Sequence, residues 1–398
     1  MAPDEPARVL ASGLDTLYLS LQVRWIDQTF LERLDDLKKQ ARAEHRSIPV
    51  VMPADDQAKA TFDLSENGVS GYAYLLRSRS LVLKVGGWIE PGSRPSVVIE
   101  IGSEALWHHT PQEIVDRARN LIESNGGEIL ETKVSRADLC IDILLPEDQW
   151  HDRLADHKVT RSRKYAAYHE GPTFSGLSIG SGDLQARFYD KPLEIKSKGD
   201  KGWFFDIWEL EQVTKGFRVI RIEFQLRRET LKQLGVGDYP TFIEGLREVW
   251  GYLTQKWLRM VRDKVHHNIE AFLPWWETVQ TGFMGQSKPQ PILRTKTHRI
   301  SEKQMAEQAW GVVTSAIALN RQGDQTQRQR QIDPSTAILE LKRLLDRHPM
   351  PIDNFRDRVD EKIARYETFE TGFAESPSHR PPAALSLPKT QTQSRESA

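Results

Sequence analysis

Tyr189 lies between two basic residues in a segment whose pattern is typical of a β-strand. If QARFYDKPLEIK is extended, Arg187, Tyr189 and Lys191 point to one face, because side chains alternate with period two. A phenol has a reference pKa of about 10 and is a weak nucleophile at neutral pH unless nearby positive charge favours the phenolate. We therefore predict that Arg187 and Lys191 activate Tyr189, although a lone tyrosine in a strand is more often a packing residue. Glu194 is left open as a metal ligand, a general base or the partner of Lys191.

Two other segments carry carboxylates in strand-like patterns. RADLCIDI puts Arg136, Asp138 and Asp142 on one face, and RVIRIEFQLRRE puts Arg221 and Glu223 on one face. The opposite face of each segment is apolar and can pack on a core. Because an ionic face is costly unless it binds a ligand or meets water, each segment predicts either a binding surface or an ordinary solvated strand face.

If these polar faces align in one sheet, the three carboxylates Asp138, Asp142 and Glu223 converge beside Tyr189. Carboxylate oxygens favour a hard divalent cation, so the expected cofactor is Mg²⁺ or Mn²⁺. The metal would polarise a phosphate, and Tyr189 would attack it. The sequence thus predicts metal-assisted chemistry at a phosphodiester.

Global charge does not point to nucleic acid, because 55 basic and 56 acidic residues give a formal net charge of −1. Local charge does, since basic clusters recur around the tyrosine segment, one of them containing Arg161, Arg163 and Lys164. We expect these three residues to contact DNA, together with Arg136 and Arg221.

The elements that would position these residues alternate between strands and helices. A half-buried strand is predicted from Asp15 to Val23, and a helix follows it over 30–45. Thr110 begins a further helix, with proline at its first position and Glu113 placed to close a capping box. A long helix is predicted from Asp238. Further strands are predicted at Tyr72–Leu76, Ser80–Val85, Ser96–Ile101, Lys133–Leu144, Gln185–Lys191 and Arg218–Leu226.

This pattern predicts an α+β fold, with mixed or antiparallel sheets flanked by helices. Asp15–Gly127 and Ile129–Met260 each offer strands followed by a substantial helix, which suits two similar halves. We predict an N-terminal α+β half for DNA binding at 1–128 and a catalytic α+β half at 129–278. A linker at 279–300, a small helical accessory segment at 301–370 and a disordered tail at 371–398 complete the organisation.

The amino-acid composition indicates in which cellular compartment the protein is expected. The 398 residues include a single cysteine, Cys140, which excludes a disulfide framework within one chain and favours a reducing cytoplasm. The N-terminus lacks the basic start and apolar stretch of a secretory signal. No apolar run approaches the roughly 18 residues of a membrane span, so no membrane association is expected.

Three motifs in this order resemble the replication initiation factor family, the rolling-circle initiators and relaxases of plasmids, phages and integrative conjugative elements. They are RADLCID, then GLSIGS…ARFYDKPLE, then RIEFQLR, and the resemblance covers about Asp15 to Met260. The positions that match the family's pattern are Arg136, Asp138 and Asp142; Tyr189, Asp190, Lys191 and Glu194; and Arg221 and Glu223.

The resemblance implies a protein that nicks one DNA strand at a replication or transfer origin, where the substrate is single-stranded or a hairpin. It implies a covalent bond between Tyr189 and the 5′ phosphate, a 3′ hydroxyl that primes synthesis, and a cooperating host helicase. A homodimer is left open. The rival nickases that bind metal through a histidine-hydrophobic-histidine triplet are disfavoured, because this sequence has no such triplet.

Two other functions remain open: a metal-dependent phosphodiesterase that uses activated water, and an origin-binding protein that has lost catalysis. Loss of a protein–DNA adduct on Tyr189→Phe would separate the first from a tyrosine nickase. Tyr165 and Tyr168 also lie beside basic residues, and each is a candidate second nucleophile, a stacking platform for bases, or a packing residue.

Overall fold

The computed structural model describes residues 7–54, 59–262, 271–285, 287–294, 302–321, 333–349, 351 and 355–359. The chain divides into two compact units, Met1–Arg294 and Thr295–Ala398. This division falls within the predicted linker at 279–300. The predicted tail at 371–398 lies outside the described residues.

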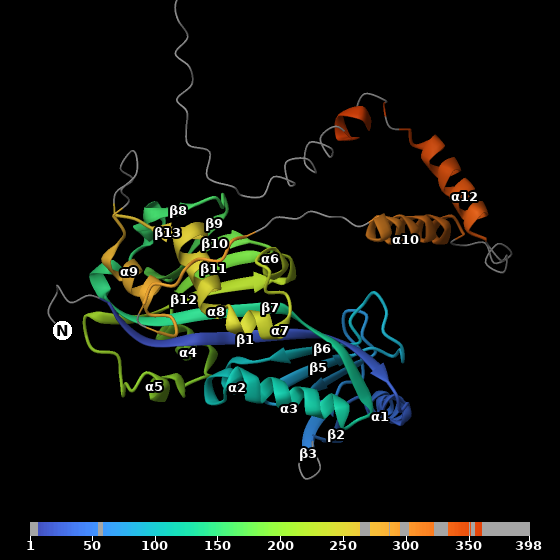
Figure 1. Ribbon diagram of the computed structural model, residues 1–398, viewed down its shortest axis with the longest axis horizontal. Coiled ribbons are helices and arrows are strands. Elements are labelled where there is room, and N and C mark those ends of the chain that lie inside the picture. The colour runs from blue at the N-terminus through green and yellow to red at the C-terminus, as the bar shows by residue number, and fades with distance from the viewer. Residues whose placement is uncertain are drawn as a thin grey trace, which may run out of the picture. The chain divides into compact units, whose positions relative to one another are not determined.

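The first unit is built on one antiparallel sheet of eleven strands in the order β2-β3-β4-β5-β6-β1-β7-β12-β11-β10-β9 (Figure 1). The strands of this sheet are β1 (Arg8–Trp25), β2 (Ile48–Pro53), β3 (Lys59–Leu64), β4 (Tyr74–Arg77), β5 (Leu81–Val85), β6 (Val97–Ile101), β7 (Gly127–Pro146), β9 (Tyr165–Glu170), β10 (Thr173–Ser181), β11 (Leu184–Asp190) and β12 (Phe217–Arg227). A second sheet pairs β8 (Lys158–Thr160) with β13 (Leu258–Met260). The α+β prediction is confirmed.

The two halves have the same strand order. In each half the first strand pairs with the last, β1 with β6 and β7 with β12, and the preceding strands then follow outward in descending order. The long strands β1 and β7 pair with each other and join the halves. The boundary predicted at 128/129 therefore lies at the start of β7, and both halves belong to one sheet. The assignment of DNA binding to one half and catalysis to the other stays a prediction.

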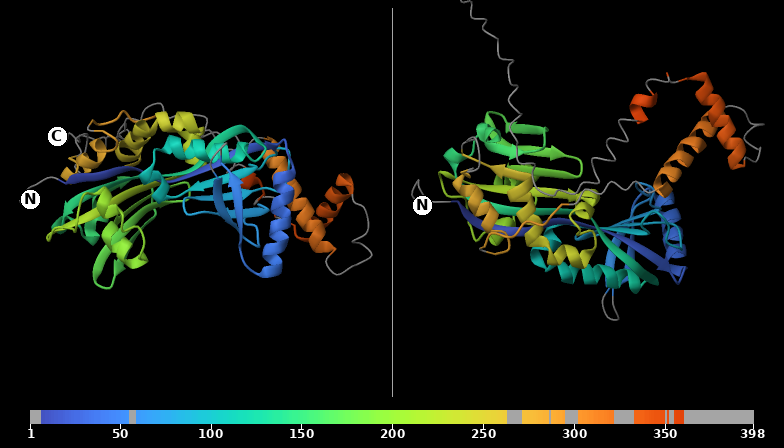
Figure 2. Two further views of the ribbon diagram at one scale, coloured as in Figure 1. Left: turned by 90° about the horizontal axis from the view of Figure 1, so that it is seen from below. Right: turned by 45° about the horizontal axis from the view of Figure 1, so that its top comes forward.

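Helices lie on both faces of this sheet. Those of the first unit are α1 (Thr29–Glu44), α2 (Ser103–His108), α3 (Pro111–Glu123), α4 (Lys191–Lys198), α5 (Phe204–Ile207), α6 (Arg228–Gln233), α7 (Tyr239–Glu244), α8 (Leu246–Tyr252) and α9 (Pro274–Thr281). Helices α3, α6, α7 and α9 contact the central strands, whereas α4 contacts β11 and β12. Figure 2 shows the segment containing α4 and α5 on the opposite side of the sheet from α8 and α9. The second unit contains α10 (Glu302–Asn320) and α12 (Pro334–Arg347).

A local signal explains α3, whereas a second predicted helix is interrupted in the structure. The predicted capping box is present, because the Thr110 side chain accepts from the Glu113 backbone and the Glu113 carboxylate accepts from the Thr110 backbone. The single long helix predicted from Asp238 is wrong. It is interrupted at Gly245 between α7 and α8, and a π-helical turn, η3 (Leu253–Trp257), ends it.

The core lies on the apolar faces that the sequence identified. Leu139, Ile141, Ile222 and Phe224 are fully buried in one hydrophobic cluster with residues of α3, α8 and α9. The polar faces of β7, β11 and β12 lie on the other side of the sheet. Among the described residues, no helix is both long enough and apolar enough to cross a bilayer.

Candidate active site

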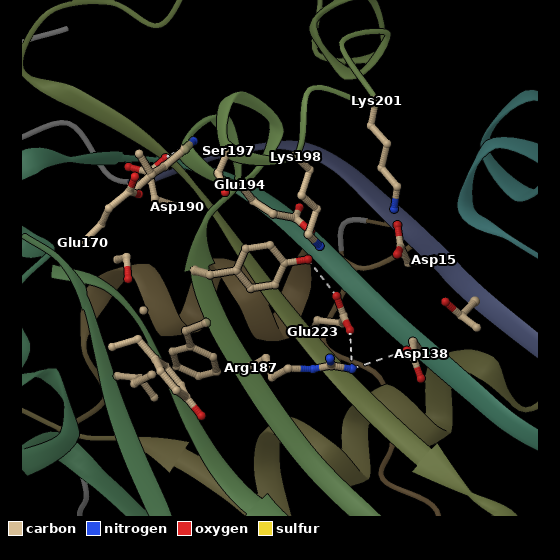
Figure 3. A pocket seen from close by; sticks show the side chains of 18 of the residues that line it. Asp15, Asp138, Glu170, Arg187, Asp190, Glu194, Ser197, Lys198, Lys201 and Glu223 are labelled. Atoms are coloured by element: carbon tan, nitrogen blue, oxygen red, sulfur yellow. Dashed lines mark hydrogen bonds and ion pairs between the residues drawn. The ribbon is translucent and has the colours of Figure 1, made fainter. Parts of the chain in front are cut away.

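A pocket of about 760 Å³ lies over the polar faces of the central strands (Figure 3). Its charged lining consists of four basic side chains, Arg136, Arg187, Lys198 and Lys201, and six carboxyl side chains, Asp15, Asp138, Glu170, Asp190, Glu194 and Glu223. Tyr189 also lines it. The structure thus brings six of the twelve predicted site residues to one cavity.

The Tyr189 hydroxyl donates a 2.8 Å hydrogen bond to Glu223 Oε2. Tyr189 on β11 is directly opposite Arg221 on β12, so it reaches Glu223 diagonally, two residues along that strand. Burial and Glu223 raise the pKa of the Tyr189 phenol well above its ordinary value, and the opposing effect of Arg221 is smaller. The prediction that flanking cations lower this pKa is therefore wrong, because the phenol faces a carboxylate.

Glu223 is placed to accept the phenolic proton. Its second oxygen, Oε1, lies 2.8 Å from Arg187 Nη2. Burial raises the pKa of the Glu223 carboxyl, Asp15 raises it further, and Arg187 only partly opposes them. A carboxylate with a raised pKa is a stronger base than one in water, so the pair has the chemistry of a nucleophile and its general base.

Arg187 connects the carboxylates on the pocket wall. Besides Glu223, its Nη2 lies 3.1 Å from Gln225 Oε1 and 3.5 Å from Asp138 Oδ2. The Arg187 side chain is 36% exposed, so its guanidinium can also reach a phosphate that enters the pocket. The prediction that Arg187 shares a face with Tyr189 is confirmed.

Lys191 is not part of the strand. The strand predicted at Gln185–Lys191 is therefore wrong at its C-terminal end. β11 stops at Asp190, whose carboxylate accepts from the Leu193 backbone and begins α4. The Lys191 ammonium is 5.5 Å from the centre of the Tyr189 ring, but its side chain is only 1% exposed. It therefore packs against Tyr189 and is not at the pocket surface.

Glu194 forms ion pairs with Lys191 and Lys198. Burial alone would raise the pKa of the Glu194 carboxyl, but the two lysines outweigh burial and lower it. Of the three roles left open for Glu194, this geometry favours holding the lysines, because a carboxylate with a lowered pKa is a weak base.

Asp142 and Arg221 are not pocket residues, which corrects two predictions. Both side chains are 0% exposed and form a two-point ion pair, with distances of 2.6 Å and 2.7 Å from Arg221 Nε and Nη2 to the two Asp142 oxygens. Trp208 also donates to Asp142, and the Phe204 ring covers the Arg221 guanidinium at 4.3 Å. Asp142 is therefore occupied by its ion pair with Arg221. Because the α4–α5 segment covers this end of the polar face, Arg221 cannot contact DNA.

The carboxylates of the predicted metal site are each paired with protein groups, and binding of an ion stays a prediction. Within the described parts of the chain, no group of three histidine, cysteine, aspartate or glutamate side chains could hold an ion. Asp142 is paired with Arg221, Asp138 forms a two-point pair with Arg136, and Glu223 is shared between Tyr189 and Arg187. As they are placed, these residues do not fit Mg²⁺ or Mn²⁺, because each carboxylate is already occupied by a protein partner.

Asp15 is a pocket residue that the sequence analysis missed. Its Oδ1 accepts from Ser103 Oγ at 2.8 Å, from Trp107 Nε1 at 3.3 Å and from Arg221 Nη1 at 2.6 Å. Burial raises the pKa of Asp15, but Arg221 and two lysines outweigh burial and hold the pKa well below its ordinary value. Asp15 lies at a register shift between Leu14 and Thr16, and a β-bulge redirects a side chain in a way that strict alternation cannot predict.

The comparisons with known proteins assign no family. No family model matches the chain, and no curated protein is significantly similar to it. Among solved structures, it is similar to a rolling-circle replication initiator protein from Geobacillus stearothermophilus. The two chains are 14% identical with a TM-score of 0.39, over 69% of this chain and 98% of the other. At this level the likeness assigns no role to any residue of this chain.

The predicted DNA-contacting residues lie in different places. Arg136 lines the pocket, and its guanidinium lies 5.2 Å from the centre of the Tyr18 ring. Arg161, Arg163 and Lys164 are exposed between β8 and β9, but they do not line the pocket. Their contact with DNA stays a prediction.

The N-terminal half contains a counterpart of the Tyr189–Glu223 pair. Lys84 on β5 is directly opposite Val98 on β6 and forms an ion pair with Glu100, two residues along that strand. Lys84 thus takes the register position of Tyr189, and Glu100 takes that of Glu223. The two halves share a diagonal polar pair, but only the C-terminal half has a hydroxyl nucleophile in it.

Asp142→Asn is expected to lower the free energy of unfolding by about 3–5 kcal/mol, because it leaves the buried Arg221 charge without its main partner. Urea unfolding would measure this loss, with and without EDTA. Glu128→Gln is the control, since it breaks only an exposed ion pair with Arg24 and should cost less than about 1 kcal/mol. A loss seen only when a divalent ion is present would instead restore Asp142 as a metal ligand.

Proposed function

We propose that this chain cuts one strand of DNA by transesterification, with Tyr189 as the nucleophile and Glu223 as the general base. The observation that carries the proposal is the 2.8 Å hydrogen bond from the phenol to a buried carboxylate on the wall of the pocket. The raised pKa of the Glu223 carboxyl suits it to take the phenolic proton during attack.

In the proposed step, Tyr189 Oη attacks the phosphorus of a phosphodiester, and its proton passes to Glu223 Oε2. The bond from phosphorus to the 3′ oxygen of the preceding nucleotide breaks, and that oxygen takes a proton from water. The products are a 5′-phosphotyrosine and a free 3′ hydroxyl. Because one phosphodiester replaces another, the reverse attack by the 3′ hydroxyl can reseal the strand.

Charge around the pocket must accommodate the phosphate. The lining has two more carboxyl groups than basic groups, which opposes an anion. Arg136 pairs with Asp138, Arg187 pairs with Glu223, and Arg221 balances Asp15 from behind, so these carboxylates are already compensated by protein cations. Arg187, Lys198 and Lys201 are then the groups that can contact phosphate oxygens in the pocket.

The biological role in this proposal is initiation of rolling-circle replication or transfer at an origin in the cytoplasm. It rests on the three ordered motifs around Asp138, Tyr189 and Glu223, and on the placement of these residues in one pocket. Cooperation with a host helicase and dimerisation remain parts of the proposal. Assistance by Mg²⁺ or Mn²⁺ is also part of it, and it would require Asp138 or Glu223 to exchange its present partner for the ion. The excess of carboxyl groups is a reason to include both ions in every assay.

The proposal is tested with 3′-end-labelled, random-sequence, single-stranded oligonucleotides incubated with the protein in EDTA, Mg²⁺ or Mn²⁺. A denaturing protein gel should show label bound to the polypeptide, and sequencing of the bound DNA would give the nick site. Cleaved DNA without protein-bound label would favour the phosphodiesterase that uses water. Binding without cleavage in all three conditions would favour an origin-binding protein without catalysis.

A further inference from the structure

The outer part of the pocket has a floor of small residues. On the face that carries Tyr189 and Arg187, the neighbouring strand β10 presents Gly176 opposite Tyr189 and Ser178 opposite Arg187. On its other side, β10 pairs with β9, where Tyr168 is opposite Gly176. Small side chains on β10 therefore separate Tyr168 from Arg187 and Tyr189, and all five residues except Ser178 line the pocket.

Gly176 allows β10 to lie close to β11 and adds no side chain above the sheet. A Cβ at Gly176 would lie 2.5 Å from the Phe188 carbonyl oxygen and 3.1 Å from the Tyr189 Cβ. The first of these contacts involves backbone, so a larger residue would force β10 away from β11. Tyr168 and Tyr189 stand on strands two spacings apart, about 10 Å. A base stacked on the exposed face of Tyr168 would have its ring centroid roughly 4.5–7 Å from that of the tyrosine, and the small residues Gly176 and Ser178 leave no bulky side chain of β10 in its way.

Tyr168 offers an exposed and fixed aromatic face. It is 51% exposed on the edge strand of the sheet, yet its hydroxyl lies 3.0 Å from Ser178 Oγ. Because β9 is the last strand, the slot is open on its outer side. Exposed aromatic rings beside a phosphate-handling site are the usual platforms for unpaired bases.

We propose that Tyr168, above the floor formed by Gly176 and Ser178, stacks on one unpaired base adjacent to the scissile phosphate. This inference rests on the proposed nicking function and adds a specific base contact to its single-stranded substrate. A base that is paired in a duplex cannot make this contact, because both of its ring faces are covered by the neighbouring base pairs. Stacking on a ring face makes the slot tolerant of base identity.

The test measures binding separately from cleavage. Tyr168→Ala and Tyr165→Ala are each made in a Tyr189→Phe background, and the affinity for labelled oligo-dT is measured by fluorescence anisotropy. Tyr168→Ala should raise the Kd about 5- to 100-fold, and Tyr168→Phe should restore most of the affinity. Tyr165 is the matched control, because it is 56% exposed on the same strand but is opposite Ile179, whose side chain is buried in the core on the other face.

A second measurement locates the contact on the DNA. In the Tyr189→Phe parent, moving a single abasic position along the oligonucleotide should weaken binding strongly at one place, and adding Tyr168→Ala should abolish that dependence. Equal affinity of Tyr168→Ala and the parent, or an equal loss of affinity in Tyr165→Ala, would disprove base stacking on Tyr168. Because anisotropy needs no cleavage, an absence of nicking would contradict the proposed function without deciding the slot.

Discussion

Replacement of Tyr189 by phenylalanine is expected to abolish the covalent protein–DNA adduct and to reduce strand cleavage by roughly 10⁴-fold or more, as removal of a nucleophile does in other enzymes. The substitution deletes only the oxygen that donates to Glu223. The ring keeps its place on β11 beside Lys191, and Glu223 keeps Arg187 as a partner. The fold should therefore remain intact, and the loss should be one of chemistry.

Denaturing gels with 3′-labelled DNA would measure the adduct, and mass spectrometry of the labelled peptide would locate it. Tyr165→Phe and Tyr168→Phe are the controls, because both tyrosines lie near the basic segment and were candidate second nucleophiles. Both control variants should form the adduct on Tyr189. An adduct that persists in Tyr189→Phe, or that maps to Tyr165 or Tyr168, would disprove the assigned nucleophile.

Alternation of polar and apolar residues predicted the central part of the site well. Period two correctly placed Asp138, Arg187, Tyr189 and Glu223 on polar strand faces, because the apolar side of each strand had to enter a core. The α+β class followed from the same reasoning, together with strong local signals such as the capping box at Thr110. These are consequences of local pattern, which a single sequence contains.

The incorrect predictions concern residues whose surroundings are set by contacts between distant parts of the chain. Asp142 is on the predicted face, but no local signal shows that α4 and α5 cover that end of the strand and bury the carboxylate against Arg221. Asp15 was missed because a bulge breaks the alternation of β1. The expected activation of Tyr189 failed because the diagonal neighbour of the phenol is Glu223, and strand register depends on pairing between distant segments.

The sequence suggested two similar halves, but only the structure shows that they share one topology. Each half pairs its first strand with its last, and Lys84–Glu100 repeats the diagonal geometry of Tyr189–Glu223, although a lysine replaces the tyrosine. A lysine side chain has no hydroxyl group that could attack phosphorus and pass its proton to the carboxylate. The N-terminal pair thus provides the internal comparison that a test of Glu223 requires.

Glu223→Gln is the second substitution with a large expected effect, a decrease of about 10²- to 10⁴-fold in the rate of adduct formation. Glutamine keeps the shape of the side chain and can still accept the hydrogen bond from Tyr189, but it cannot take the proton. The equivalent change in the other half, Glu100→Gln, should leave the rate unchanged, because Glu100 does not line the pocket. Single-turnover rates on the same labelled DNA would make the comparison.

The pH dependence distinguishes a general base from a residue that only positions Tyr189. Because burial raises the pKa of the Glu223 carboxyl, the active carboxylate form should be lost as pH falls through that raised pKa, which lies above the usual value for glutamate. The wild-type rate should therefore rise with pH over this range, and Glu223→Gln should lack that rise. A raised carboxyl pKa also means that the ionised side chain costs stability above the pKa of the unfolded chain, so Glu223→Gln should not lower Tm at neutral pH. A variant that keeps both the rate and its rise with pH would show that another group accepts the proton.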